Sequence, residues 1–218
     1  MDKYANFAAL EAAENKQRYA IYQREGTSGV AVIAPHGGGI EPGTLELADS
    51  IAGTNHAYYA FDGKKKNGST DLHITSTNFD EPVGVEIARK SQTVVAIHGC
   101  GGDEDEVVYL GGLHKDLKLA IKRALTEAGF EVGEHDNPNL QGVDGNNICN
   151  RCAGASGVQL ELPEGLRSRM FKNLTRAGRA ICTEVFDRFV NAMRTALADN
   201  SKPNADHGKP VQTNGDKA

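Results

Sequence analysis

The sequence predicts an α/β fold, with one compact domain built on a mixed, mostly parallel sheet that is flanked by helices. Short runs of apolar and β-branched residues alternate along the chain with longer amphipathic segments, the pattern of parallel strands joined by helices. Two of these runs, 30–34 and 93–97, are almost continuously apolar, as strands buried on both faces are. The chain has 218 residues, of which 39% are hydrophobic, enough for one sizeable core.

The elements of the first half follow from apolar periodicity and from turn residues. A glycine-rich loop follows the strand at 30–34, and Thr44 has the character of a helix N-cap. The pattern predicts a helix over 3–15, strands over Tyr19–Arg24 and 30–34, a helix from Thr44 to Gly53, strands over 57–61 and 72–75, and a helix over Pro82–Lys90.

The second half continues the alternation. Strands are predicted at 93–97, 130–132 and 157–162, and helices at 113–128, 166–173 and 175–198. Ile181, Val185, Phe189 and Met193 recur at nearly heptad spacing, so we expect them to pack into the core. The domain is therefore assigned to residues 1–198. The polar segment 199–218 has one aliphatic residue besides alanine, Val211, and is expected to be a disordered tail.

Charge and hydropathy exclude several classes of partner. The net charge is −5 and the pI is near 5.8, without a basic stripe, which argues against nucleic acid and against membrane surfaces. No apolar run approaches the roughly 20 residues of a membrane span. The N-terminus has no hydrophobic signal core, so we expect synthesis in the cytoplasm without a signal peptide. We also expect a monomer.

The four cysteines do not form a zinc motif. Cys149 and Cys152 make a C-x-x-C pair, but a structural zinc site needs a second such pair. A thioredoxin-like site normally lies near the start of its domain, and this pair does not. We therefore interpret the cysteines, including Cys100 and Cys182, as reduced packing residues.

Histidines and carboxylates follow the ends of the predicted strands. His36 and then Glu41 follow the run 30–34, His98 follows the run 93–97, and Glu161 lies at the end of the strand 157–162. Carboxyl ends of parallel strands meet at one edge of a sheet, so these side chains are expected to converge. Imidazole and carboxylate ligands suit Zn²⁺. We predict one zinc ion per chain on His36, Glu41 and His98, with Glu161 as general base.

Simpler interpretations exist for each residue. A histidine after a strand is commonly an ordinary loop residue, although two in glycine-rich loops favour a metal. Glu46 is an alternative to Glu41, but it falls inside a predicted helix. Glu161 could face outward from an edge strand, although Leu160 and Leu162 beside it have the character of buried residues.

Cationic side chains are candidates for binding substrate. Arg151 in the segment NNICNR is either a surface arginine or a clamp for a substrate carboxylate or a developing oxyanion. His73 is either a core histidine or a residue that faces the cleft. The lysines at 64–66 form a solvated turn that matters only if the substrate is a polyanion.

Four ordered motifs, APHGGGIEPGT, DLHITSTNFDEP, AIHGC and NICNR…GVQLEL, together resemble the phage-type poly-γ-glutamate hydrolase family over most of residues 4–172. The resemblance implies a zinc hydrolase with a carboxypeptidase-like α/β fold. It implies His36, Glu41 and His98 as zinc ligands and Glu161 as the catalytic glutamate. His36 and Glu41 are five positions apart, whereas the zinc carboxypeptidase pattern has three.

The resemblance also implies the substrate, a glutamate polymer linked through its side-chain carboxyl groups. Each unit keeps a free α-carboxylate, so the cleft needs cations, with Arg151 and His73 as the first candidates. Release on host lysis would bring the enzyme to its extracellular polymer. Alternatives are a zinc aminoacylase or carboxypeptidase acting on a small acidic amide, a non-catalytic polymer-binding protein, and a phosphate-binding domain. Glu41 in the glycine loop argues against the last of these.

Overall fold

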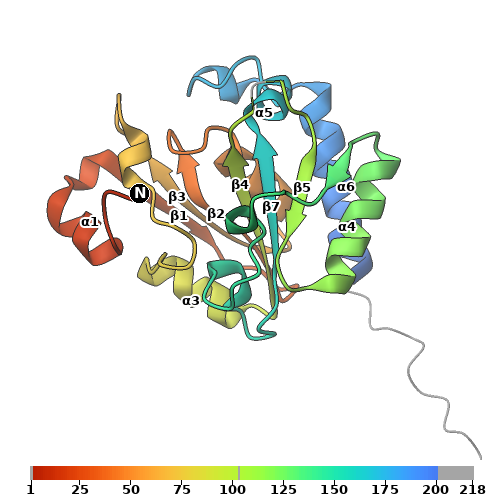
Figure 1. Cartoon of the computed structure of the whole chain (residues 1–218), viewed down its shortest axis with the longest axis horizontal. Helices are drawn as coiled ribbons and strands as arrows, with labels where there is room; N and C mark the ends of the chain where they lie inside the picture. The colour runs from red at the N-terminus through yellow and green to blue at the C-terminus, as the bar shows by residue number, and fades with distance from the viewer. Residues whose placement is uncertain (1, 103, 201–218) are drawn as a thin grey trace, which may run out of the picture.

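The computed structural model describes residues 2–102 and 104–200 as a three-layer α/β domain with a seven-stranded sheet in the middle (Figure 1). The strand order is β1-β3-β2-β4-β7-β5-β6. Pairs β3–β2, β2–β4, β4–β7 and β5–β6 are parallel, whereas β1–β3 and β5–β7 are antiparallel. The predicted mixed, mostly parallel sheet is confirmed. The strands are β1 (Tyr19–Arg24), β2 (Val30–Gly38), β3 (Ala57–Gly63), β4 (Thr93–Cys100), β5 (Val108–Gly111), β6 (Val132–Gly133) and β7 (Val158–Pro163).

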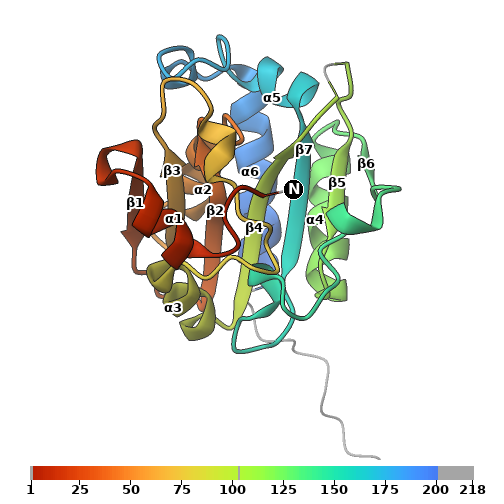
Figure 2. The same ribbon diagram turned by 60° about the vertical axis from the view of Figure 1, so that its left-hand side comes forward.

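Helices cover both faces of the sheet. Figure 2 shows α2, α4 and α6 behind the sheet and α1 and α3 in front of it. The helices are α1 (Phe7–Ala13), α2 (Thr44–Ala52), α3 (Pro82–Lys90), α4 (Lys115–Glu127), α5 (Glu164–Met170) and α6 (Glu184–Asn200). None of the helices in the described part of the chain is long and apolar enough to cross a bilayer.

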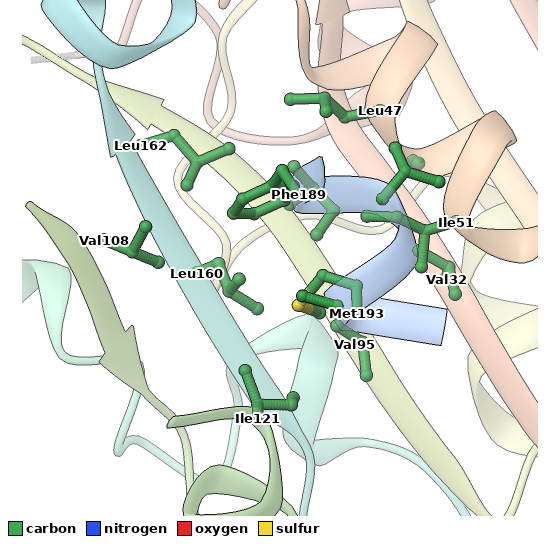
Figure 3. Close-up of a cluster of buried hydrophobic side chains, with 14 of the residues drawn as sticks. Val32, Leu47, Ile51, Val95, Val108, Ile121, Leu160, Leu162, Phe189 and Met193 are labelled. Carbon is green, nitrogen blue, oxygen red and sulfur yellow. The ribbon is translucent and has the colours of Figure 1, made fainter. Parts of the chain in front are cut away.

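Two apolar clusters lie on opposite faces of the sheet because successive side chains of a strand point to opposite sides. Val32 and Ala34 of β2 pack with α2, α4 and α6, whereas Ala31 and Ile33 pack with α1 and α3. The larger cluster centres on Phe189 and Met193 of α6, which lie between strand residues and Ile51 of α2 (Figure 3). Phe189 is fully buried, so truncating it to alanine would cost about 3–5 kcal/mol.

Several predicted elements and boundaries differ from the structure. Residues 72–75 are not a strand: a 3₁₀ helix over Ser69–Leu72 precedes an irregular segment. The short strand β5 has no predicted counterpart. The last helix starts at Glu184 instead of 175, which leaves Ile181 52% exposed and not in the core. It ends at Asn200, two residues beyond the predicted domain end, and the rest of the predicted tail, 201–218, lies outside the described residues.

The four cysteines are free thiols. Cys149 and Cys152 are buried, as predicted for packing residues, whereas Cys182 is exposed and Cys100 is partly buried.

Candidate metal centre

His36 reaches its position through an irregularity in β2. Ala34 of β2 pairs with Ala60 of β3, and Gly37 pairs with Asp62. Over this stretch β2 advances three residues while β3 advances two. The extra residue is a bulge, and Pro35 lies within it, consistent with the missing N–H of proline. In a regular strand His36 would share the face of Ala34. The bulge turns it to the opposite face, where its ring contacts Phe79.

The loop after His36 turns tightly and returns Glu41 to the same place. Gly38 has a φ of +71°, and a Cβ atom there would lie 1.8 Å from a carboxylate oxygen of Asp62. Glycine is therefore required at this position. The amide of Glu41 donates to the carbonyl of His36 at 2.9 Å, and the Thr44 hydroxyl donates to the carbonyl of Glu41 at 2.9 Å. The N-cap of α2 is Gly43 and not, as predicted, Thr44; Thr44 is the first residue of the helix.

The predicted ligands converge on one point. The Nδ1 atom of His36 lies 2.9 Å from Oε1 of Glu41 and 3.1 Å from Nδ1 of His98. Nδ1 of His98 lies 3.5 Å from the other carboxylate oxygen of Glu41. One donor atom from each residue falls within 4.8 Å of the other two. The three side chains are thus arranged as one ligand set.

A hydrogen bond on the far side of the His36 ring fixes which of its nitrogens is free. Nε2 of His36 lies 2.8 Å from the carbonyl oxygen of Ile74, which can only accept, so Nε2 carries the proton. In the neutral ring, Nδ1 then presents its lone pair toward Glu41 and His98. Nε2 of His98 lies 3.5 Å from the Ser76 hydroxyl. A backbone carbonyl behind the ring is the usual partner of a metal-ligating histidine.

Glu161 stands beside this ligand set. It lies opposite His98 in the parallel pair β4–β7, and both side chains line a cavity of about 370 Å³. The side-chain amide of Gln159 donates to Oε1 of Glu161 at 3.0 Å and also to the carbonyl of Leu140 at 3.1 Å. Gln159 in turn accepts from the Asn147 amide at 2.8 Å. The carboxylate is therefore held from the loop over 138–147.

The two carboxylates have different environments. Burial disfavours ionisation of Glu41, but when His36 and His98 are protonated their positive charge and the hydrogen bonds that their rings donate hold its pKa below the usual range. Burial raises the pKa of Glu161 well above the usual range, and the charge of Glu41 adds to this. A pair of acids whose pKa values are pushed apart is characteristic of acid–base sites.

Comparison with known proteins gives the family. The family model described as poly-gamma-glutamate hydrolase matches residues 4–192. The chain belongs to the poly-γ-glutamate hydrolase family. It is 35% identical over 202 residues to the SPbeta prophage-derived UPF0714 protein YoqZ of Bacillus subtilis, covering 91% of this chain and 73% of YoqZ. It is 34% identical to the UPF0714 protein YndL of the same organism, covering 88% of this chain and 76% of YndL.

Solved structures agree with this family. A bacteriophage poly-gamma-glutamate hydrolase superposes with a TM-score of 0.88 at 33% identity, covering 92% of this chain and 98% of the other. A YndL structure described as apo and zinc-free gives a TM-score of 0.86 at 32% identity, covering 92% and 99%. The predicted family and the predicted enzyme class are confirmed.

Arg167 of α5 joins the segments of this hydrolase that carry the ligand set and Glu161. Its guanidinium donates to the carbonyls of Pro42, Cys100 and Leu162 at 2.8, 2.9 and 2.9 Å. These carbonyls follow Glu41, His98 and Glu161 in sequence. Arg167 is 3% exposed and packs against Gly99, where a Cβ atom would lie 2.8 Å from the guanidinium carbon. One buried cation therefore ties the loop after β2 to the ends of β4 and β7.

His73 lies in the position predicted for a residue that faces the cleft. Its ring centroid is 4.0 Å from that of His36, and Nε2 is 3.9 Å from Oε1 of Glu41. Nδ1 lies 2.7 Å from a carboxylate oxygen of Asp2, whose other oxygen accepts from the amide of Thr75 at 2.6 Å. Asp2 thereby orients His73 toward the cavity.

Arg151 is placed elsewhere. Its guanidinium donates to the carbonyl of Phe79, with Asp80 and Arg89 as charged neighbours, and Arg151 does not line the cavity. It follows a buried 3₁₀ helix, Ile148–Asn150, which fixes where its backbone emerges. Glu46, the alternative to Glu41, accepts from Arg179 at 2.8 Å and is not part of the ligand set.

Sequence analysis overlooks Gln159 and Arg167. Gln159 could have been found, because it lies two positions before Glu161 in a strand and so shares its face. Arg167 gives no such signal, because the sequence does not show which of the two arginines in this helix, Arg167 or Arg169, is buried.

Proposed function

We propose that this chain cleaves the γ-glutamyl amide bonds of poly-γ-glutamate, with a Zn²⁺ ion on His36, Glu41 and His98 and with Glu161 as general base. The observation that carries the proposal is the convergence of three donor atoms beside a separately held carboxylate. Membership in the family supports the choice of substrate.

The donor set fits zinc. Two imidazole nitrogens and one carboxylate are a common set of three protein ligands in catalytic zinc sites, which leaves a fourth position open. The proton on Nε2 of His36 leaves Nδ1 free to coordinate. The description of a YndL structure as zinc-free supports the same metal in a relative. When bound, the ion would supply a Lewis acid that polarises the amide carbonyl and makes water more acidic.

Glu161 provides the proton transfers. As a carboxylate it takes a proton from the attacking water while the new C–O bond forms at the amide carbon. As a carboxylic acid it delivers that proton to the amide nitrogen while the C–N bond breaks. Its raised pKa suits the second role, and the hydrogen bond from Gln159 favours the first.

Polar side chains contribute about half of the cavity wall. Besides the ligand set, hydroxyl and amide side chains line the cavity, from Thr75, Ser76, Thr77, Asn139 and Asn147. Within the described chain, neither lysine nor arginine lines this cavity. His73 is therefore our candidate for contacting a substrate carboxylate, and Arg151 is given no role. Action as a monomer and release on host lysis stay predictions.

Product sizing tests the function and separates it from its alternatives. Poly-γ-glutamate is incubated with zinc-loaded protein, with chelated protein and with zinc-loaded Glu161→Gln protein. We expect shortened polymer only with the first. Release of single residues from small acidic amides without loss of polymer length would instead indicate an aminoacylase or carboxypeptidase. Binding of the polymer without cleavage under all three conditions would indicate a non-catalytic protein.

A further inference from the structure

A second cavity lies on the other side of the loop that carries Glu41. It measures about 290 Å³. It adjoins the cavity beside the ligand set, which we call the metal cavity, because Gly39 and Pro42 line the second cavity and Glu41, between them in sequence, lines the metal cavity. The remaining wall of the second cavity comes from the turn 63–66 after β3 and from Leu174, Arg176 and Arg179 before α6. We call it the lysine groove.

The lysine groove is cationic. Lysines 64, 65 and 66 and the two arginines line it, and no acidic side chain does. Three of these cations are already paired: Lys65 with Asp71 at 2.7 Å, Arg176 with Asp62 at 2.7 Å, and Arg179 with Glu46 at 2.8 Å. The charge that remains is that of the other two lysines.

Lys64 and Lys66 are exposed, and across residues 2–102 and 104–198 no carboxylate pairs with either. The turn that presents them is held in place. The amide of Gly39 donates to the carbonyl of Gly63 at 2.9 Å, and the Ser69 hydroxyl donates to the carbonyl of Lys65 at 2.9 Å. Two uncompensated positive charges thus stand at a fixed place in a protein with a net charge of −5.

We propose that the lysine groove is a second polyanion-binding site, which holds a segment of poly-γ-glutamate away from the bond that is cut. This inference rests on the proposed function. Each γ-linked unit carries one free carboxylate, and the metal cavity has no lysine or arginine to receive those of flanking units. A chain that crosses the 39–42 loop from the metal cavity enters the lysine groove, which Lys64 and Lys66 line.

Binding to a cleavage-deficient protein tests the site. Fluorescence anisotropy is used to measure the affinity of labelled poly-γ-glutamate for Glu161→Gln protein and for the same protein with Lys64→Gln and Lys66→Gln. We expect the double substitution to weaken binding about tenfold at low salt and to reduce the salt dependence of the affinity. A γ-linked glutamate dimer bound in the metal cavity has no flanking units to occupy the lysine groove, so its affinity should not distinguish the two proteins.

The matched control carries Lys115→Gln and Lys122→Gln on α4, two exposed lysines outside the groove. It changes net charge equally and should bind the polymer as the parent does. Equal weakening by both pairs, or no weakening by the groove pair, would overturn the inference. Because this readout is binding, cleavage of the polymer by zinc-loaded wild-type protein would leave the proposed function intact even then.

Discussion

Nδ1 of His36 and Nδ1 of His98 face each other at 3.1 Å, although 62 residues separate them in the chain. Two neutral ring nitrogens with lone pairs at this distance repel each other unless a proton or a cation lies between them. Glu41 completes the set with a carboxylate 2.9 Å from one ring nitrogen and 3.5 Å from the other. A divalent cation between the three side chains would relieve that repulsion, and the folded chain already holds these side chains together.

Replacing Arg167 with methionine should weaken the fold and the metal site together. Three buried carbonyls would lose their donor, at a combined cost of about 3 kcal/mol or more in unfolding free energy. Zinc affinity should fall because the loop after β2 and the ends of β4 and β7 lose the hydrogen bonds that hold them together. Urea unfolding and zinc titration measure the two effects. Arg169→Met removes a half-exposed arginine from the same helix and is the control; equal effects from both substitutions would refute the role of Arg167.

Replacing Gln159 with methionine should slow turnover without loss of zinc. The Gln159 amide donates to Glu161, which favours the ionised base, so its removal should raise the pKa of Glu161. The rising limb of the pH–rate profile should move to higher pH, and turnover should fall by about 10- to 100-fold. The control is Gln23→Met, at an exposed position of β1. An unmoved pH limb in Gln159→Met would show that Gln159 does not tune Glu161.

Gly38→Ala should destabilise the loop that links the first two ligands. A side chain at a φ of +71° is strained, and its Cβ would collide with Asp62 at 1.8 Å. We expect a loss of about 2 kcal/mol or more in unfolding free energy, together with weaker zinc binding. Gly145→Ala is the control, because a Cβ there meets no atom within 4 Å. If Gly38→Ala melts at the temperature of Gly145→Ala, the loop is not constrained as described.

Much of the site could be predicted, because the signals were local. An apolar run followed at once by histidine marks the end of a buried strand, and the topology of parallel strands brings such ends together. The bulge at Pro35 could not be predicted in the same way, since the residue pairing of β2 depends on β3 and is a tertiary property. The interpretation of Arg151 failed for a related reason. Its direction depends on Phe79, more than 70 residues earlier in the chain.

The segment 72–75 shows how a pattern can mislead. Leu72 and Ile74 alternate with polar residues as in a strand, and both are buried. The backbone carbonyl of Ile74, however, accepts from His36 instead of joining a sheet. Alternation reports which side chains are buried, and an irregular segment that crosses a core face has the same alternation.

Stability should depend on pH through His56, which does not belong to the ligand set. Burial, with Arg194 nearby, lowers its pKa from the ordinary value of 6.5. The Ser28 hydroxyl accepts from the amide of Val30 at 3.1 Å and lies 2.6 Å from Nδ1 of His56. Below pH 6.5 the unfolded chain takes up a proton that the folded chain resists.

The contribution of His56 is therefore complete above pH 6.5 and is lost as the pH falls through the lowered folded-state value. We expect the unfolding free energy of wild-type protein to decline more steeply from pH 7 to pH 5 than that of His56→Asn. Urea midpoints across this range give the comparison. Parallel declines would show that His56 does not contribute to the acid sensitivity.

Zinc titration of chelated protein, followed by polymer cleavage, tests the central claim most directly. We predict that activity is absent in the metal-free protein and returns in proportion to added Zn²⁺. It should reach its maximum at about one ion per chain, and neither His36→Ala nor His98→Ala should recover. Full cleavage of poly-γ-glutamate by the metal-free protein would contradict the account.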